Sequence, residues 1–141
     1  MSARPAPVVA VVAAILIEKG RVLVTQRLAD DRFSGRWEFP GGKVETGETH
    51  AEALVRELEE ELALPVTVGT LFTRHELPRT GGGTLVLFFY RVRRGPGEPR
   101  AVEVADWRWV IAEELRELDM LDSNATAVEE VCGLLGTRSQ P

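Results

Sequence analysis

The stretch that decides the fold runs from Gly42 to Leu64 and reads GKVETGETHAEALVRELEEELAL. Its segment Thr49-His50-Ala51-Glu52 has the spacing of a capping box, so we expect a helix with Thr49 as its N-cap. Pro65 follows the stretch and should end the helix, because proline cannot continue one. At about 100° per residue, one stripe of this helix is apolar and should face the core, namely Ala51, Leu54, Val55, Leu58 and Leu62.

Three glutamates of the same helix, Glu57, Glu60 and Glu61, stand at i, i+3 and i+4 and therefore project from one arc. Glu59 points elsewhere, toward solvent. Like charges at this spacing repel one another by roughly a few tenths of a kcal/mol per exposed pair. A solvated acidic face is one interpretation, but the fixed spacing to a preceding glycine pair, glutamate and arginine favours a metal site. Mg²⁺ would offset the repulsion, because it prefers oxygen ligands and commonly bridges carboxylates to phosphates.

Composition gives the frame for this helix. The chain has 141 residues, 44% hydrophobic and 28% charged, as in an ordinary soluble globular protein, and we expect one domain over residues 1–141. The net charge of −5 and the pI of about 5.1 argue against a binder of duplex nucleic acid, which usually carries a basic face. They do not argue against a nucleotide substrate, since a bound metal reverses the local sign of charge. Cys132 is the single cysteine, which excludes an internal disulfide and a multi-cysteine zinc site.

The N-terminal region holds an apolar run, Val8 to Ile17, that either a secretory signal or a buried strand would explain. Glu18-Lys19-Gly20 then makes a turn, and Arg21 to Arg27 alternates as a second strand would. A hairpin explains both runs together, so we favour strands over a signal. No segment reaches the roughly eighteen apolar residues of a membrane span. We therefore expect a cytoplasmic protein that makes no membrane contact.

The remaining sequence alternates between strand-like and helix-like segments. A short extended piece, Arg36–Phe39, runs into a turn at Pro40-Gly41-Gly42. The other expected strands are Val66–Arg74, Thr84–Val92 and part of Val102–Val110, and the other expected helices are Ile111–Leu118 and Asn124–Leu135. The last helix should turn Ala125, Val128, Val131, Cys132 and Leu135 inward. Strands interleaved with helices predict the α/β class, with a mixed sheet covered on both faces.

The spacing within Gly42–Leu64 resembles the Nudix box, G-x5-E-x7-R-E-U-x-E-E-x-G-U, in which U is a bulky aliphatic residue. Every charged position matches, and one position departs, since the box has glycine where this chain has Ala63. Glycine there suits a left-handed helix C-cap, so we expect a stability cost of roughly 1 kcal/mol and retained catalysis. The resemblance implies a Nudix α/β/α sandwich with a mixed central sheet. Val8–Glu18, Gln26-Arg27 and Trp37–Lys43 are similar to the MutT-like branch, whose members sanitise damaged nucleoside triphosphates.

The resemblance also implies the reaction and its cofactor. Nudix proteins hydrolyse a nucleoside diphosphate linked to another group, and they require Mg²⁺ or Mn²⁺. The box implies that Glu57 orients or deprotonates the attacking water, while Arg56 holds Glu57 and Glu48 pairs with the scaffold. MutT-like proteins carry a further glutamate six residues before a tryptophan, and Glu103 matches it. The implied catalytic residues are Glu57, Arg56 and Glu60, and the implied metal ligands are Gly41 (through its carbonyl), Glu57, Glu60, Glu61 and Glu103.

For the substrate, the same branch supplies weaker matches. Arg27 matches an arginine that contacts phosphate, although a surface strand arginine is an alternative. Asn124 matches an asparagine that hydrogen-bonds oxidised guanine, but asparagine is also a common helix cap. Relatives that favour cytidine nucleotides carry Asp at that position. Phe39 lines the same pocket or belongs to the core, and Lys43 lies near phosphate or is solvated. The implied substrate-binding residues are Arg27, Glu38, Phe39, Pro40, Gly41, Gly42, Lys43 and Asn124.

The leading hypothesis is therefore a Mg²⁺-dependent nucleoside triphosphate pyrophosphohydrolase of the MutT type, with 8-oxo-dGTP as the preferred substrate. A second hypothesis keeps the chemistry and changes the substrate to CTP, a methylated dCTP or a nucleotide sugar such as ADP-ribose. A third is a non-catalytic nucleotide-binding module, which the complete set of box glutamates disfavours. The expected partner is a small-molecule nucleotide, with neither duplex nucleic acid nor membrane. A monomer and a homodimer both remain open.

Overall fold

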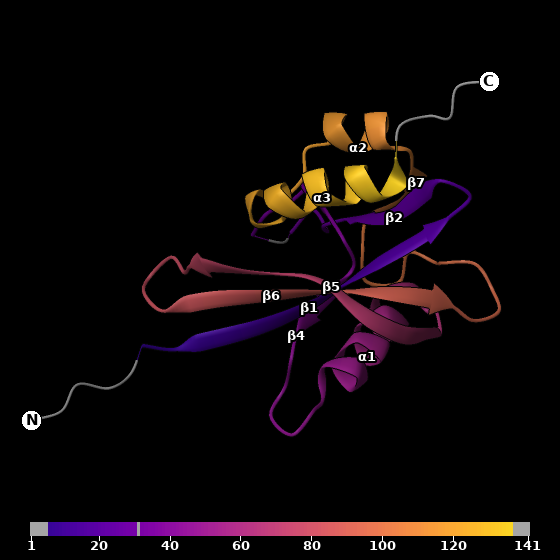
Figure 1. Cartoon of the computed structure of the whole chain (residues 1–141). Coiled ribbons are helices and arrows are strands. Elements are labelled where there is room, and N and C mark those ends of the chain that lie inside the picture. Colours follow the sequence, from indigo (N-terminus) through magenta and orange to yellow (C-terminus); the bar gives the residue numbers. More distant parts are fainter. Residues whose placement is uncertain (1–5, 31, 137–141) are drawn as a thin grey trace, which may run out of the picture.

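The computed structural model describes residues 6–30 and 32–136 of the chain (Figure 1). The elements are β1 (Val8–Glu18), β2 (Arg21–Gln26), β3 (Trp37–Glu38), β4 (Gly41–Lys43), α1 (His50–Leu62), β5 (Val66–Pro78), β6 (Thr84–Arg94), β7 (Asp106–Val110), α2 (Ala112–Glu117), the 3-10 turn η1 (Asp122–Asn124) and α3 (Ala125–Leu135). The order of strands and helices is the expected one. Two elements differ from the sequence prediction: β5 continues to Pro78, and the glycine pair lies in strand β4 rather than in a turn.

Strand β1 joins the two parts of a mixed sheet. It pairs in parallel with β6 from Val8 to Leu16, and antiparallel with the short β4. At its end it pairs antiparallel with β2 through the tight turn Lys19-Gly20, where both residues have positive φ, as two-residue hairpins of this kind require. Beyond β1, strand β5 extends the sheet next to β6, and β2 carries β3 and β7.

Alternate residues of β1 supply two hydrophobic cores, one on each face of the sheet. Ala13 and Ile15 belong to the core that α2 and α3 cover, whereas Val12, Ala14 and Leu16 belong to the core that α1 covers. Figure 1 shows α1 on one side of the sheet and α2 with α3 on the other. The predicted α/β class, with a mixed sheet covered on both faces, is thus confirmed.

The buried faces of two helices differ from the expected stripes. In α1 the predicted core residues Ala51 and Val55 are exposed, and Ala53 is buried in their place. The buried arc is rotated because the row of Ala53, Glu57 and Glu61 also turns toward the sheet, where α1 meets β4. In α3, Ala125 is exposed and Ala127 is buried instead, while Val128, Val131 and Cys132 are buried as predicted. Within the described ranges, no helix is long and apolar enough to cross a bilayer.

Candidate active site

Helix α1 is fixed at both ends, which sets the register of its glutamates. Thr49 forms the predicted capping box: its hydroxyl accepts from the Glu52 N–H at 3.0 Å, and the Glu52 carboxylate accepts from the Thr49 N–H at 2.9 Å. The helix ends at Ala63 in the left-handed conformation (φ 51°, ψ 38°), as the box predicted for that position. The N–H groups of Val102 and Glu103 both donate to the Glu61 carbonyl, so the Glu103 loop covers the end of α1. The Glu103 side chain itself is exposed, and its metal role stays a prediction.

The glycine pair makes room for helix α1. A Cβ atom at Gly42 would lie 2.3 to 2.5 Å from the carboxylate atoms of Glu57, and one at Gly41 would lie 2.0 Å from the Val12 carbonyl oxygen. Only glycine therefore fits at Gly41, against the backbone of β1, whereas a side chain at Gly42 would displace the Glu57 carboxylate. The close approach places the backbone of Gly42 directly against the Glu57 side chain.

Arg56 organises the carboxylates that surround it. Its Nε and Nη2 atoms lie 2.6 and 2.9 Å from the two carboxylate oxygens of Glu48, a bidentate pair. Its Nη1 donates to Glu57 at 2.9 Å and to Glu60 at 3.3 Å, and Nη2 also donates to the Lys43 carbonyl at 3.1 Å. The hydrogen bond from Arg56 holds the pKa of Glu48 down at about 2, and the same partners raise the pKa of Arg56. The predicted roles of Arg56 as holder of Glu57, and of Glu48 as scaffold partner, agree with these contacts.

Glu61 lies among other carboxylates and away from solvent. Burial, a hydrogen bond with Glu57, and the charges of Glu57 and Glu38 together raise the pKa of Glu61 to about 10, while the Gly41 N–H partly opposes the rise. The direction of this shift favours the protonated form of Glu61 when no cation is bound. The predicted trio is thus not uniform: Glu57 and Glu61 turn inward, and Glu60 is about half exposed (47%).

The donor set suits a hard divalent cation. All the converging groups are oxygen donors, and Mg²⁺ and Mn²⁺ prefer such ligands. The buried contact of Glu57 with Glu61 is unfavourable for two anions, and a cation relieves it by displacing the shared proton. In the part of the chain that the structure describes, no three acidic, histidine or cysteine side chains are already gathered around one metal position. One physical reason is that Arg56 holds Glu57 and Glu60 toward itself.

Arg27 lies beside this acidic group. Its Nε and Nη2 atoms are 3.0 and 3.2 Å from the two carboxylate oxygens of Glu38, which stands on the neighbouring strand β3. Both side chains are largely buried, with 29% and 23% exposed. Since the charge of Glu38 also acts on Glu61, the pair connects Arg27 to the carboxylates of α1. Lys43 is exposed, as expected if its side chain is solvated rather than held at a phosphate site.

Asn124 and Phe39 meet immediately after β3. Asn124 is only 4% exposed, and its Oδ1 accepts from the Phe39 N–H at 3.1 Å, across 85 positions of sequence. Asn124 is the N-cap residue of α3 by position, but its side chain makes no capping hydrogen bond to that helix. Phe39 is 2% exposed, and its ring packs edge-to-face on Phe89 with centroids 6.1 Å apart. Phe39 therefore belongs to the hydrophobic core, which was one of its two expected roles. Pro40 is buried as well, and its carbonyl accepts from the Ala14 N–H at 2.8 Å.

Two features of the site were not foreseen from the sequence. Glu38 was named only as a substrate contact, yet it belongs to the acidic group around Glu61. Arg36 was not named, yet it binds the segment that leads into α3. Both depend on where β3 lies relative to distant parts of the chain. The only sequence signal was the position of both residues just before the glycine pair.

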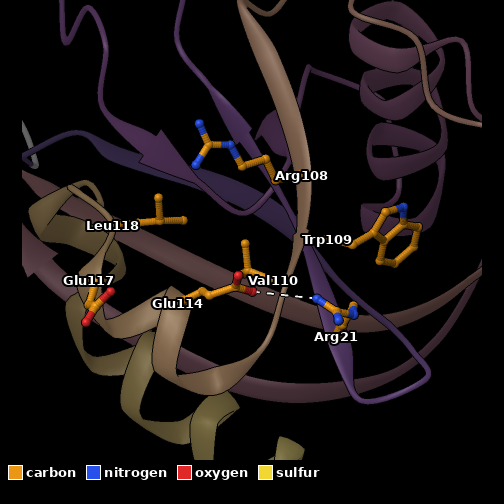
Figure 2. A pocket seen from close by; sticks show the side chains of 7 residues that line it. All are labelled: Arg21, Arg108, Trp109, Val110, Glu114, Glu117 and Leu118. Atoms are coloured by element: carbon orange, nitrogen blue, oxygen red, sulfur yellow. Dashed lines mark ion pairs between the residues drawn. The ribbon is translucent and has the colours of Figure 1, made fainter.

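One surface cavity lies apart from all these residues. It measures about 590 Å³ and is lined by residues of β2, β7 and α2 with the adjoining Leu118. Figure 2 shows Arg108, Val110, Leu118, Glu114 and Glu117 around it, with Trp109 pointing the other way. An ion pair there joins Arg21 to Glu114 at 3.6 Å, between half-exposed side chains. None of its lining residues belongs to the predicted site, so cavity size does not locate the chemistry.

Comparison with known proteins gives a consistent picture. The model of the NUDIX domain matches residues 6–131. A Mycobacterium tuberculosis protein provisionally named 8-oxo-dGTP diphosphatase 2 is 42% identical over 114 residues, covering 81% of each chain. The CTP pyrophosphohydrolase of Escherichia coli is 35% identical, covering 91% of this chain and 94% of its own. Among solved structures, the Escherichia coli ORF135 protein superposes with a TM-score of 0.81 at 34% identity over 95% of both chains. A MutT NUDIX hydrolase from Burkholderia pseudomallei gives 0.78 at 28% identity, covering 89% and 98%.

Proposed function

The chain belongs to the NUDIX family, as a hydrolase of phosphoric anhydrides with MutT-like relatives, and we propose that its substrate is a nucleoside triphosphate. Water would break the bond between the α- and β-phosphoryl groups, releasing a nucleoside monophosphate and pyrophosphate. The observation that carries this proposal is the Arg56-centred group of carboxylates packed against a glycine strand. Such a group holds oxygen donors and an activated water beside a backbone that a phosphate can approach closely.

The metal would be Mg²⁺, with Mn²⁺ as a substitute. The ligands that we propose for it are Glu57, Glu60, Glu61 and the Gly41 carbonyl, with Glu103 as a further candidate. When bound, the cation supplies a Lewis acid that neutralises phosphoryl charge and lowers the pKa of a water molecule.

The chain's own residues would supply position and proton transfer. Glu57 accepts a proton from the attacking water, or orients that water, because its carboxylate lies at the surface of the glycine strand. Arg56 fixes Glu57 through the 2.9 Å hydrogen bond and is itself fixed by the bidentate contact with Glu48. Catalysis of this kind depends on orientation, and a shift of about 1 Å can cost roughly a hundredfold in rate.

Substrate recognition would use the strands on either side of the carboxylates. Arg27 would contact phosphate while keeping Glu38, since a guanidinium offers five N–H donors. Lys43 would add a second positive charge, and the backbone of residues 38–42 would form one wall. Asn124 would read the base, with 8-oxo-dGTP as the preferred nucleotide and nucleotide-pool sanitation as the cellular role. Relatives named for 8-oxo-dGTP support this choice.

CTP is the second candidate substrate. It is favoured by the CTP pyrophosphohydrolase relative, which aligns over 91% of this chain. The two candidates are separated by measuring nucleoside monophosphate and pyrophosphate from a panel of 8-oxo-dGTP, dGTP, CTP and dCTP, with Mg²⁺ and with a chelator. We expect Mg²⁺-dependent release of pyrophosphate, with the highest kcat/KM for 8-oxo-dGTP. Release of orthophosphate alone, or turnover that persists in the chelator, would contradict the proposal.

A further inference from the structure

The segment between α2 and α3 is attached mainly to β3. We call residues 118–124 the approach loop, because they lead into α3 and end at Asn124. The Trp37 N–H donates to the Asp119 carbonyl at 2.9 Å, and the Leu121 N–H donates back to the Trp37 carbonyl at 2.8 Å. Trp37 and Met120 form a parallel bridge between these bonds. Strand β3, which leads into the glycine pair, therefore also holds the approach loop.

Arg36 strengthens this attachment immediately before β3. Its Nη2 donates to the Met120 carbonyl and, at 3.0 Å, to the Asp122 carboxylate, while its Nε lies 3.1 Å from Asp119. Arg36 is 26% exposed, but the side chains of Asp119 and Asp122 are 75% and 99% exposed. Ion pairs to such exposed carboxylates contribute little. The bond to the backbone carbonyl is therefore the anchoring contact.

The approach loop borders a shallow surface depression of about 300 Å³, which Arg36 lines together with residues of α2, the loop and α3. On this side the loop faces solvent rather than other side chains. The hydrogen bonds to β3 and to Arg36 are therefore the contacts that we take to position it.

The Asn124 amide depends on where the loop lies. A backbone N–H can only donate, so the bond from Phe39 fixes the Asn124 oxygen toward β3 and turns the NH₂ group the other way. That NH₂ group donates to the Ser123 hydroxyl at 3.4 Å, which is a long and therefore weak hydrogen bond. If the loop moved, a buried acceptor would lose its partner, and the amide would lose its fixed orientation.

We propose that Arg36 is a positioning residue that, by anchoring the approach loop to β3, sets the Asn124 amide for selection of the nucleobase. The inference rests on the proposed function, because it takes Asn124 to contact the base. Arg36 would touch neither substrate nor metal. Its removal should therefore weaken binding of the base while leaving the bond-breaking step intact.

Arg94 offers a matched control for Arg36. Its side chain is 25% exposed, it pairs with the carboxylates of Glu18 at 2.7 Å and Glu98 at 3.1 Å, and it donates to the Gly97 carbonyl. It thus has the same kinds of partners and nearly the same burial, but it lies at the end of β6 and outside the proposed site. Arg36→Ala and Arg94→Ala remove equivalent local contacts.

The experiment measures kcat and KM for two nucleotides that differ in base, together with amide hydrogen exchange at Phe39. We expect Arg36→Ala to raise KM for the preferred nucleotide roughly five- to tenfold and to lower base selectivity, with kcat changed less than about twofold. The Phe39 amide should exchange faster in Arg36→Ala only. Arg36→Lys, which keeps a donor for the Met120 carbonyl, should recover most of the lost affinity.

Three results would overturn the inference: equal KM changes in the Arg36 and Arg94 variants, unchanged base selectivity, or unchanged exchange at Phe39. If Arg36→Ala does not fold, Arg36→Lys is compared with Arg94→Lys, and the absence of any difference in selectivity overturns it as well. Failure of the proposed function gives a distinct result: the unmodified protein would then hydrolyse none of the four nucleotides 8-oxo-dGTP, dGTP, CTP and dCTP. The exchange at Phe39 still decides whether Arg36 anchors the loop.

Discussion

The carboxylate end and the base end of the site are held in contrasting ways. Around Arg56, hydrogen bonds join residues that are 1 to 13 positions apart in sequence, and one guanidinium holds Glu48, Glu57 and Glu60 together. Asn124 ends the approach loop, and its side-chain oxygen is held by one hydrogen bond from Phe39, 85 positions away. The reaction end is thus encoded locally and redundantly, whereas the base end depends on a few long-range contacts. Such an arrangement lets the substrate vary without loss of the chemistry.

The largest effect should come from the reaction end. Glu57→Gln removes the proposed proton acceptor while keeping the size of the side chain, so kcat should fall by about 10²–10⁴-fold. Glu60→Gln should also lower kcat by orders of magnitude, because it removes a proposed metal ligand. Steady-state release of pyrophosphate measures both, and circular dichroism confirms that the fold persists.

Glu59→Gln is the matched control for these two variants. Glu59 stands on the same helix but is exposed, and within residues 6–30 and 32–136 its side chain forms no hydrogen bond or ion pair. Its kcat should stay within about twofold of the unmodified protein, as expected for a surface substitution. Equal losses of kcat in all three variants would mean that the total charge of the helix matters rather than a specific site. The carboxylates around Arg56 would then not form the reaction end of the site.

The same contrast explains what could be predicted from the sequence. The helix and its capping box follow from residues within a few positions of one another, and both were confirmed. The sequence left open whether a left-handed C-cap at residue 63 or Pro65 ends the helix, and the structure has the left-handed C-cap at Ala63. The rotated face of α1 could not be foreseen from the sequence. Hydrophobicity predicts that Val55 faces the core, but α1 packs Glu57 against β4, and this rotation leaves Val55 exposed. The contacts of Arg36 and Glu38 depend on tertiary pairing of β3, for which a single sequence gives no signal.

Glu48 and Glu61 should give the metal-free protein opposite dependences on pH. Glu61, with its pKa raised from 4.5 to about 10, holds a proton that the unfolded chain releases, so its contribution is full below pH 4.5 and is lost as pH rises toward 10. The slope is at most about 1.4 kcal/mol per pH unit. Glu48, with its pKa lowered to about 2, contributes above pH 4.5 and loses that contribution as pH falls toward 2.

Thermal unfolding between pH 5 and 9 tests the Glu61 part of this expectation. The melting temperature of the metal-free protein should fall with rising pH, and Glu61→Gln should flatten the fall. The stabilisation by Mg²⁺ should grow with pH, because the cation replaces the proton of Glu61. A Mg²⁺ effect that is the same at pH 6 and pH 8.5 would remove Glu61 from the ligand set.

At the base end, Asn124→Ala should lower kcat/KM for 8-oxo-dGTP by about tenfold more than for dGTP, because one specific hydrogen bond to the base is lost. The value of kcat for either nucleotide should change little. Since Asn124 is buried and bonded to Phe39, some loss of stability is expected as well. Equal effects on both nucleotides would show that Asn124 supports β3 without reading the base.

The smallest effect concerns Ala63, where the chain departs from its family's box. Alanine in the left-handed conformation costs about 1–2 kcal/mol, but glycine also loses more freedom on folding, so Ala63→Gly should stabilise the protein by only about 0.5–1 kcal/mol. For a chain of this length, that gain raises the melting temperature by about 2–4 °C.

Lys19 provides the comparison for this prediction. It is the other non-glycine residue with positive φ (53°) among the described residues, and it lies in the β1–β2 turn. Lys19→Gly should give a gain of similar size, since both changes relieve the same backbone conformation. Neither should alter kcat, because the main-chain bonds that end α1 at residue 63 are made by any amino acid other than proline. A change of turnover in Ala63→Gly alone would mean that the helix end, held by the Glu103 loop, acts on the position of Glu61.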